Sequence, residues 1–295
     1  MKRFLSRRVL VLAAVLLLCA VMLTGYLNGS RSAFAAGAGD AYVKSTLQLK
    51  HTLRFNSSGK FKILIFSDIQ DWKNMTTTDT LQYMNRMLDL EKPDLVLLGG
   101  DNHVGAAATQ ETMQAYLDVL ASPMESRKIP WAQVYGNHVE GGYDFDNGFS
   151  KESQQKIFEA YPYNLSKAGT VYGSGNYVLP VLASGSDKIA FNVFMLDSHS
   201  YLESYIKGFE KQALVKRALY SGKVYDCIHF DQIKWYWDTS VALERYNGAK
   251  IPAMMLFHIP LYEWNYIVKN PTKTGMTGSQ GEAVCAPEMN SGLFQ

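Results

Sequence analysis

The chain has 295 residues, of which 47% are hydrophobic and 19% charged, and a formal net charge of +2. Its length allows one large domain or two small ones, and the low charged fraction excludes a long disordered or nucleic-acid-binding tail. Five of the 29 basic residues and none of the 27 acidic ones lie in residues 1–35, which leaves 24 bases and 27 acids in the remainder. We therefore expect no nucleic-acid partner and only a local attraction for phosphate.

The N-terminus has the three parts of a secretory signal peptide. Basic residues within 2–8 precede an apolar run over 9–23, and Ala33-Phe34-Ala35 supplies the small residues that signal peptidase reads. We expect cleavage after Ala35 and export to the periplasm, the cell surface or the extracellular space. An uncleaved N-terminal membrane anchor is the alternative, because an apolar run of this length is ambiguous.

A tether over residues 36–58 is expected to lead into a single domain over 59–295, which begins with alternating strands and helices. Apolar runs and helical spacing predict a β-α-β-α-β-α order and hence a mostly parallel sheet covered by helices. These elements are expected over residues 61–66, 78–90, 94–98, 110–120, 130–135 and 151–161.

The second half is different. Residues 176–182 and 188–196 are β-rich runs joined by a short turn segment, which is the pattern of a hairpin. A helix over 231–246 and a strand over 252–257 follow, and the aromatic side chains of Trp235, Tyr236 and Trp237 are expected to fill the core rather than to stack on a base. Two β-rich halves with helices fit an α/β sandwich of two sheets with the helices outside.

Polar residues follow four of the expected strands, and this is the most informative pattern in the sequence. Each residue alone is typical of a helix cap, a turn or a packed histidine. Together they place carboxylate, amide and imidazole donors where parallel strands end, which predicts a site for divalent metals. The segments are Ser67-Asp68-Ile69-Gln70-Asp71, Gly99-Gly100-Asp101-Asn102-His103, Gly136-Asn137-His138-Val139-Glu140 and His258-Ile259-Pro260.

These segments resemble the successive motifs of the calcineurin-like metallophosphoesterases, and in particular the purple-acid-phosphatase-like branch of the yeast cell-cycle phosphatase type. The similarity runs from about residue 61 to the end of the chain, and the Gly-Asn-His-Val-Glu segment is its most specific part. It implies a four-layered α-β-β-α sandwich of two mixed sheets flanked by helices, and two metal ions about 3.5–4 Å apart.

The resemblance also implies a ligand set. Asp101 bridges the two metals, because a carboxylate has two oxygens. Asp68, with Gln70 beside it, binds the first metal. Asn137 and His258 bind the second.

His138 is implied as the general acid, which protonates the leaving oxygen after a metal-bound hydroxide attacks phosphorus. The expected function is hydrolysis of a phosphate ester on a phosphorylated small molecule, with monoesters favoured over diesters. Two alternatives stay open: an inactive metal- or phosphate-binding fragment, and a phosphodiesterase that acts on cyclic nucleotides or lipid head groups.

The sequence departs from the family pattern at three places. Gln70 stands where the family usually has histidine, which favours the harder ions Mn²⁺, Mg²⁺ and Fe²⁺; Zn²⁺ stays a candidate for the pair of divalent metals. Val104 replaces the tyrosine that colours purple acid phosphatases, so the protein is expected to be colourless. No histidine follows His258, although the family closes with a Gly-His-x-His element, so we expect the domain to be incomplete at its C-terminal end.

Other residues are weaker candidates. Asn102 and His103 follow Asp101 directly and are expected to contact substrate, whereas His199 is interpreted as structural. Cys227 and Cys285, the two cysteines that remain after cleavage, either pair outside the cytoplasm or stay as separate thiols.

Overall fold

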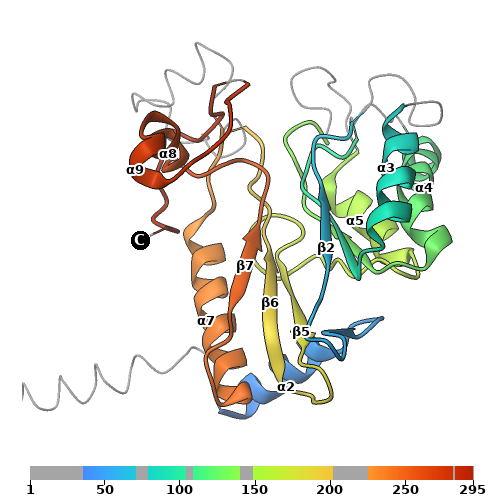
Figure 1. Ribbon diagram of the computed structural model, residues 1–295, viewed down its shortest axis with the longest axis vertical. Helices are drawn as coiled ribbons and strands as arrows, with labels where there is room; N and C mark the ends of the chain where they lie inside the picture. Colours follow the sequence, from blue (N-terminus) through green and yellow to red (C-terminus); the bar gives the residue numbers. More distant parts are fainter. Residues whose placement is uncertain are drawn as a thin grey trace, which may run out of the picture.

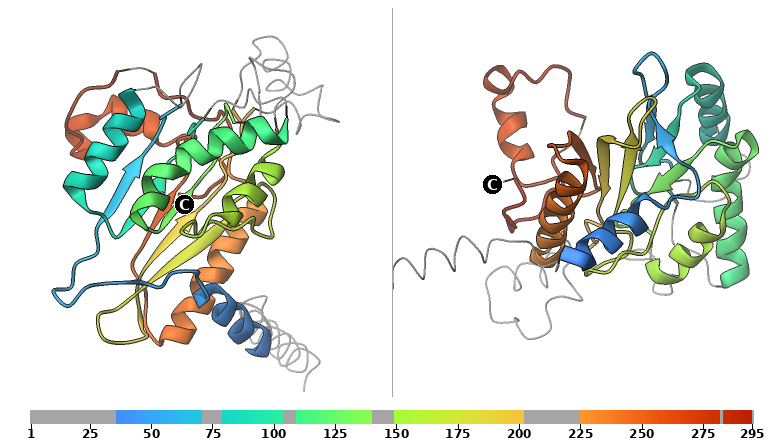
Figure 2. Two further views of the ribbon diagram at one scale, coloured as in Figure 1. Left: turned by 90° about the vertical axis from the view of Figure 1, so that its right-hand side faces the viewer. Right: turned by 90° about the horizontal axis from the view of Figure 1, so that it is seen from below.

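The computed structural model describes residues 36–70, 79–103, 109–139, 149–201, 225–281 and 283–294. Two β-sheets pack face to face with helices on both outer faces, as Figures 1 and 2 show. The expected α-β-β-α layering is therefore confirmed. Among these residues no helix is long and apolar enough to cross a membrane, and the expected signal peptide lies outside them.

The smaller sheet comes from the first half of the chain and is entirely parallel, in the order β2-β3-β4. The central strand is buried on both faces, because the larger sheet covers one face and helices cover the other. Successive side chains of a strand point to opposite sides, so they enter two different cores. Leu95 and Leu97 enter the core between the sheets, while Val96 and Leu98 pack beneath the helices. The strands are β2 (Ile63–Phe66), β3 (Leu95–Leu98) and β4 (Trp131–Gln133).

Helices α3 (Asp79–Glu91), α4 (Gln110–Arg127) and α5 (Lys151–Ala160) cover the outer face of this sheet (Figure 1). Helix α4 runs seven residues past its expected end at residue 120 and includes Pro123. Proline has no N–H for the carbonyl four residues earlier, which is that of Val119. The hydroxyl of Ser122 donates to that carbonyl oxygen at 2.9 Å, and so the helix continues.

The larger sheet has the order β1-β5-β6-β7 and is mixed. Strands β5 and β6 are antiparallel, which confirms the predicted hairpin, whereas β6 and β7 are parallel. Helices α2 and α7 cover its outer face, and the short helices α8 and α9 follow β7 (Figure 1). The elements are β1 (Leu53–Arg54), β5 (Tyr177–Leu182), β6 (Ile189–Met195), β7 (Ala253–Leu256), α2 (Ala36–Leu47), α7 (Phe230–Asn247), α8 (Trp264–Lys269) and α9 (Pro271–Thr274).

Two details differ from the sequence-based expectation. The expected tether contains α2 and β1, because Val43 and Leu53 are buried in the two cores of the larger sheet. The aromatic cluster is split: Trp235 packs against Phe194, whereas Trp237 is 66% exposed. Residues two positions apart on a helix do not share a face, so both tryptophans cannot enter one core.

A buried ion pair joins the two halves of the fold. The Nζ atom of Lys151, in the first turn of α5, lies 2.9 Å from Oδ1 of Asp197, which follows β6. Burial raises the pKa of Asp197, but Lys151, His199 and the N–H of Ser174 outweigh burial, so the pKa is lowered from its ordinary 3.8. The stability from this ionisation is therefore present above that value and is lost as the pH falls through the lowered pKa.

Replacing Asp197 with alanine is expected to lower the free energy of unfolding by about 3–5 kcal/mol, because the charge of Lys151 stays buried without its carboxylate. Urea denaturation at neutral pH measures this loss. Asp187→Ala is the matched control, since the ion pair of Asp187 with Arg54 is exposed and is expected to contribute less than about 1 kcal/mol. Equal losses in the two variants would contradict the structural role of the buried pair.

Candidate metal centre

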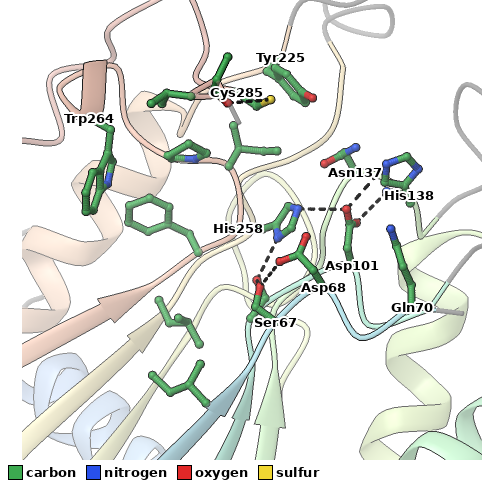
Figure 3. A pocket seen from close by; sticks show the side chains of 18 residues that line it. Ser67, Asp68, Gln70, Asp101, Asn137, His138, Tyr225, His258, Trp264 and Cys285 are labelled. Atoms are coloured by element: carbon green, nitrogen blue, oxygen red, sulfur yellow. Dashed lines mark hydrogen bonds and ion pairs between the residues drawn. The ribbon is translucent and has the colours of Figure 1, made fainter. Parts of the chain in front are cut away.

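The loops that follow β2, β3, β4 and β7 converge on a cavity of about 620 Å³. Every residue for which the sequence predicts a metal-ligand or general-acid role lines this cavity (Figure 3). Four strand ends far apart in sequence thus bring their polar side chains to one place. These residues are Asp68, Gln70, Asp101, Asn137, His138 and His258.

Asp101 lies at the centre of this group and is almost fully buried. Its Oδ2 atom is 3.2 Å from Nε2 of His258 and 3.9 Å from Nε2 of His138. Its Oδ1 atom accepts the backbone N–H of His138 at 3.0 Å. The carboxylate therefore presents one oxygen to each of two neighbouring loops, as Figure 3 shows.

The backbone around the carboxylates is unusual. Asp68 has φ 54° and Asp101 has φ 45°, which is the left-handed region that residues other than glycine rarely adopt. The two loops support each other, because the N–H of Gln70 donates to the carbonyl of Asp101 at 3.2 Å. A Cβ on Gly136 would lie 2.0 Å from Oδ1 of Asp101, so the glycine of the Gly-Asn-His segment allows this close approach.

His258 is oriented by its backbone partner. Its Nδ1 atom donates to the carbonyl of Gly99 at 3.0 Å, which directs Nε2 at Asp101. Burial lowers the pKa of His258, but the hydrogen bond and charge of Asp101, together with Asp68, outweigh burial and raise it. Burial raises the pKa of Asp101, but His258 and His138 outweigh it, so this pKa is lowered.

A protonated His258 must lose its proton before it can bind a metal. We therefore expect the affinity for Mn²⁺ to rise about tenfold per pH unit below the raised pKa of His258 and to level off above it. Calorimetric titrations of Mn²⁺ at a series of pH values measure this slope. His258→Gln is expected to bind more weakly and with a flatter slope, and His51→Gln is the control; an unchanged slope in His258→Gln would exclude this coupling.

The donor atoms fit a divalent cation. Asp68, Asp101 and His258 offer ligand atoms within 4.8 Å of one another. The Oε1 atom of Gln70 is buried without a hydrogen-bond partner, which is costly unless a cation satisfies it. The amide nitrogen of Asn137 donates to a tyrosine hydroxyl at 3.0 Å, so its oxygen is the atom left for a metal. This set of carboxylates, amides and imidazole suits Mn²⁺, Fe²⁺, Mg²⁺ or Zn²⁺.

Asn102 and His103 are placed differently from the expectation. Both are buried, and neither lines the cavity. The amide of Asn102 donates to the carbonyl of Val134 at 3.0 Å, and Nε2 of His103 lies 2.8 Å from Oε1 of Gln154. Burial lowers the pKa of His103 to about 4, which keeps it neutral. The left-handed turn at Asp101 directs these two side chains into the fold, so their placement does not support a substrate contact.

Several residues of the site carry no signal in the sequence. The hydroxyl of Tyr201 accepts a hydrogen bond from the side-chain amide of Asn137. The hydroxyl of Ser67 donates one to Oδ2 of Asp68 at 2.5 Å. Tyr225 and Trp264 also line the cavity (Figure 3). Ser67 and Trp264 lie close to motifs in sequence, whereas Tyr201 and Tyr225 come from other segments, and no spacing rule marks any of them as part of the site.

Other residues of interest are placed as follows. Val104 and Glu140 lie outside the described residues. Cys227 is buried, Cys285 is exposed, and both are free thiols, so they do not pair. His51 stacks on Tyr163 and does not line the cavity.

Comparisons with known proteins identify the family to which the chain belongs. The family model of the calcineurin-like phosphoesterases matches residues 61–267. The chain is 28% identical to "probable inactive purple acid phosphatase 14" of Arabidopsis thaliana, over 83% of this chain and 64% of that protein. It is 29% identical to the phosphatase DCR2 of Saccharomyces cerevisiae, over 81% of this chain and 42% of that protein.

The chain thus spans less than two thirds of the length of these relatives. A solved structure of a dimetal phosphatase from Danio rerio is similar over 68% of this chain and 70% of its own, with 12% identity and a TM-score of 0.43. The family model covers most of the chain, including the four strand ends that form the cavity. The chain therefore belongs to the calcineurin-like phosphoesterase family.

Proposed function

We propose that the protein hydrolyses phosphate monoesters at a site for two divalent cations. The observation that carries this proposal is the position of Asp101, whose two oxygens face different loops at the centre of the cavity. Asp68 and His258 offer donor atoms close to Asp101, and Gln70 and Asn137 line the same cavity. The unpaired oxygen of Gln70 favours a hard cation such as Mn²⁺, Mg²⁺ or Fe²⁺.

When bound, such cations lower the pKa of a coordinated water and neutralise charge on the phosphate. The protein's own groups do the rest. Asp101 and His258 hold each other at 3.2 Å, and the contact of His258 with the Gly99 carbonyl keeps its Nε2 atom directed into the cavity. His138 has a side chain 29% exposed at the cavity, where its imidazole can reach a bound substrate and pass a proton to a leaving oxygen.

The test is hydrolysis of p-nitrophenyl phosphate and bis-p-nitrophenyl phosphate by Mn²⁺-loaded protein whose metal content is measured on the same sample. Faster release from the monoester is expected. Faster release from the diester would favour the phosphodiesterase alternative. Bound metal without either activity would favour a metal-binding protein that has lost catalysis, which is the alternative suggested by relatives named inactive.

We also propose that the protein is exported, on the strength of its basic and apolar N-terminus and the small residues before Ala36. The intact mass of the protein purified from a secreting host is the test. A mass that begins at Ala36 is expected, and a full-length mass in the membrane fraction would support an uncleaved anchor.

A further inference from the structure

A second cluster of metal-type donors lies outside the cavity. His199, Asp226 and His229 each offer a ligand atom, and these three atoms lie within 4.8 Å of one another. His199 and Asp226 are buried, and the side chain of His229 is 11% exposed. The cluster is formed by the loop after β6 and the segment before α7, and none of its members lines the cavity of the metal centre.

The spacing of His229 and Asp226 suits two ligands of one cation. Nε2 of His229 lies 3.1 Å from both carboxylate oxygens of Asp226. Ligand atoms of a tetrahedral zinc ion, at zinc–ligand distances of about 2.0–2.2 Å, are roughly 3.3–3.6 Å apart, slightly more than the separation in this pair. A histidine beside a carboxylate is common without a metal. This pair differs because a second imidazole, that of His199, lies with its ring centre 4.6 Å from that of His229.

The surrounding hydrogen bonds decide which nitrogen of His199 holds a lone pair. The side-chain nitrogen of Gln232 donates to Oδ1 of Asn176 and to the carbonyl of Asp197, at 2.8 and 2.7 Å. The Oε1 atom of Gln232 must therefore accept hydrogen bonds. It accepts one from the backbone N–H of His229 at 2.7 Å and one from the ring nitrogen Nε2 of His199 at 2.8 Å. Nε2 of His199 thus carries the hydrogen, and in the neutral ring Nδ1 has the lone pair.

The Nδ1 atom of His199 lies 3.7 Å from Oδ2 of Asp197, so a lone pair and a carboxylate oxygen lie near each other without a hydrogen bond of ordinary length. Gly173 leaves room here, since a Cβ at that position would lie 2.7 Å from Cε1 of His199 and 2.9 Å from Oδ2 of Asp197. Lys151 balances the charge of Asp197. The carboxylate of Asp226 has only histidine as an ion-pair partner among the described residues, and a divalent cation would balance it.

We propose that His199, Asp226 and His229 form a cation site separate from the phosphoesterase centre, and that it takes Zn²⁺. Two imidazoles and one carboxylate are typical zinc ligands, whereas Mn²⁺ and Mg²⁺ prefer oxygen. His199 lies in the loop that supports Asn137. The hydroxyl of Ser200 donates to the backbone carbonyl of Asn137 at 3.2 Å, and the hydroxyl of Tyr201 accepts from the side-chain amide of Asn137 at 3.0 Å. Bound zinc therefore anchors the loop that orients one ligand of the metal centre.

The test uses the full chain with Asp101→Ala, which removes the central carboxylate of the metal centre. This variant is loaded with Zn²⁺ and desalted, and its zinc content is measured by mass spectrometry. A stoichiometric zinc ion is expected, and adding His229→Gln is expected to remove it. Adding His51→Gln is the control and is expected to keep it. No zinc in the Asp101→Ala chain, or equal zinc with and without His229→Gln, would overturn the proposal.

A spectroscopic measurement does not depend on the folding of the His229→Gln variant. X-ray absorption of zinc in the Asp101→Ala chain is expected to show two imidazole ligands together with oxygen. Zinc coordinated by sulfur, for which Cys227 next to Asp226 is the nearest source in sequence, or by oxygen alone would overturn the assignment. Zn²⁺ is also expected to raise the melting temperature of the Asp101→Ala chain, and an unchanged melting temperature would count against an anchoring role.

Discussion

Replacing Asp101 with alanine is expected to empty the metal centre of Mn²⁺ and to lower phosphatase turnover by at least about 10³-fold. The magnitude follows from the several kcal/mol of transition-state stabilisation that bound metal ions supply, at 1.36 kcal/mol for each factor of ten. Asp101 is the central donor, because it contacts His258 through one oxygen and the loop of His138 through the other. Metal analysis of desalted protein and steady-state kinetics measure the two effects.

Two further variants make this prediction specific. Asp94→Ala is a matched control on the same loop-strand unit: Asp94 precedes β3, at the opposite end from Asp101, and its side chain accepts the N–H of Lys62. It is expected to keep the metals and the activity. Asp68→Ala is expected to lose part of the bound Mn²⁺, because Asp68 is proposed to serve one of the two cations. If Asp101→Ala retains its full metal content, the central role of this carboxylate is wrong.

The second large effect is expected from His138→Ala, which should lower turnover by about 10²–10⁴-fold without loss of metal. The side chain is partly exposed at the cavity, and its Nε2 atom is 3.9 Å from Asp101, beyond hydrogen-bond distance. The contact that His138 makes with Oδ1 of Asp101 comes from its backbone N–H, so alanine preserves it. The substitution therefore removes the proposed acid and leaves the carboxylate supported.

The dependence on the leaving group separates a general acid from a structural residue. A good leaving group such as p-nitrophenolate needs little protonation, whereas an alkoxide needs much. The loss in His138→Ala is therefore expected to be smaller on p-nitrophenyl phosphate than on an alkyl phosphate. Equal losses on the two substrates, or a loss of Mn²⁺, would argue against protonation of the leaving oxygen by His138. His51→Ala is the control, since His51 packs on Tyr163 outside the cavity.

The layered fold and the positions of the polar motifs were readable from the sequence. Alternating apolar runs predicted the parallel sheet, because a run such as 94–98 is buried on both faces only in such a sheet. In the sequence, Asp68, Asp101 and Asn137 each follow a predicted strand within a few residues. Parallel strands end at the same edge of their sheet, so these residues are expected at one edge. Local periodicity therefore determined which strand ends meet.

The direction of each side chain and the contacts between distant segments were decided only by the tertiary structure. The left-handed backbone at Asp101 is followed by a His103 side chain buried in the core, although Asp101, two residues earlier, lines the cavity. Tyr201 reaches Asn137 across 64 residues of sequence, and His199 lies beside His229 across 30. Such contacts form when packed layers bring unrelated segments together, and no periodicity in the chain encodes them.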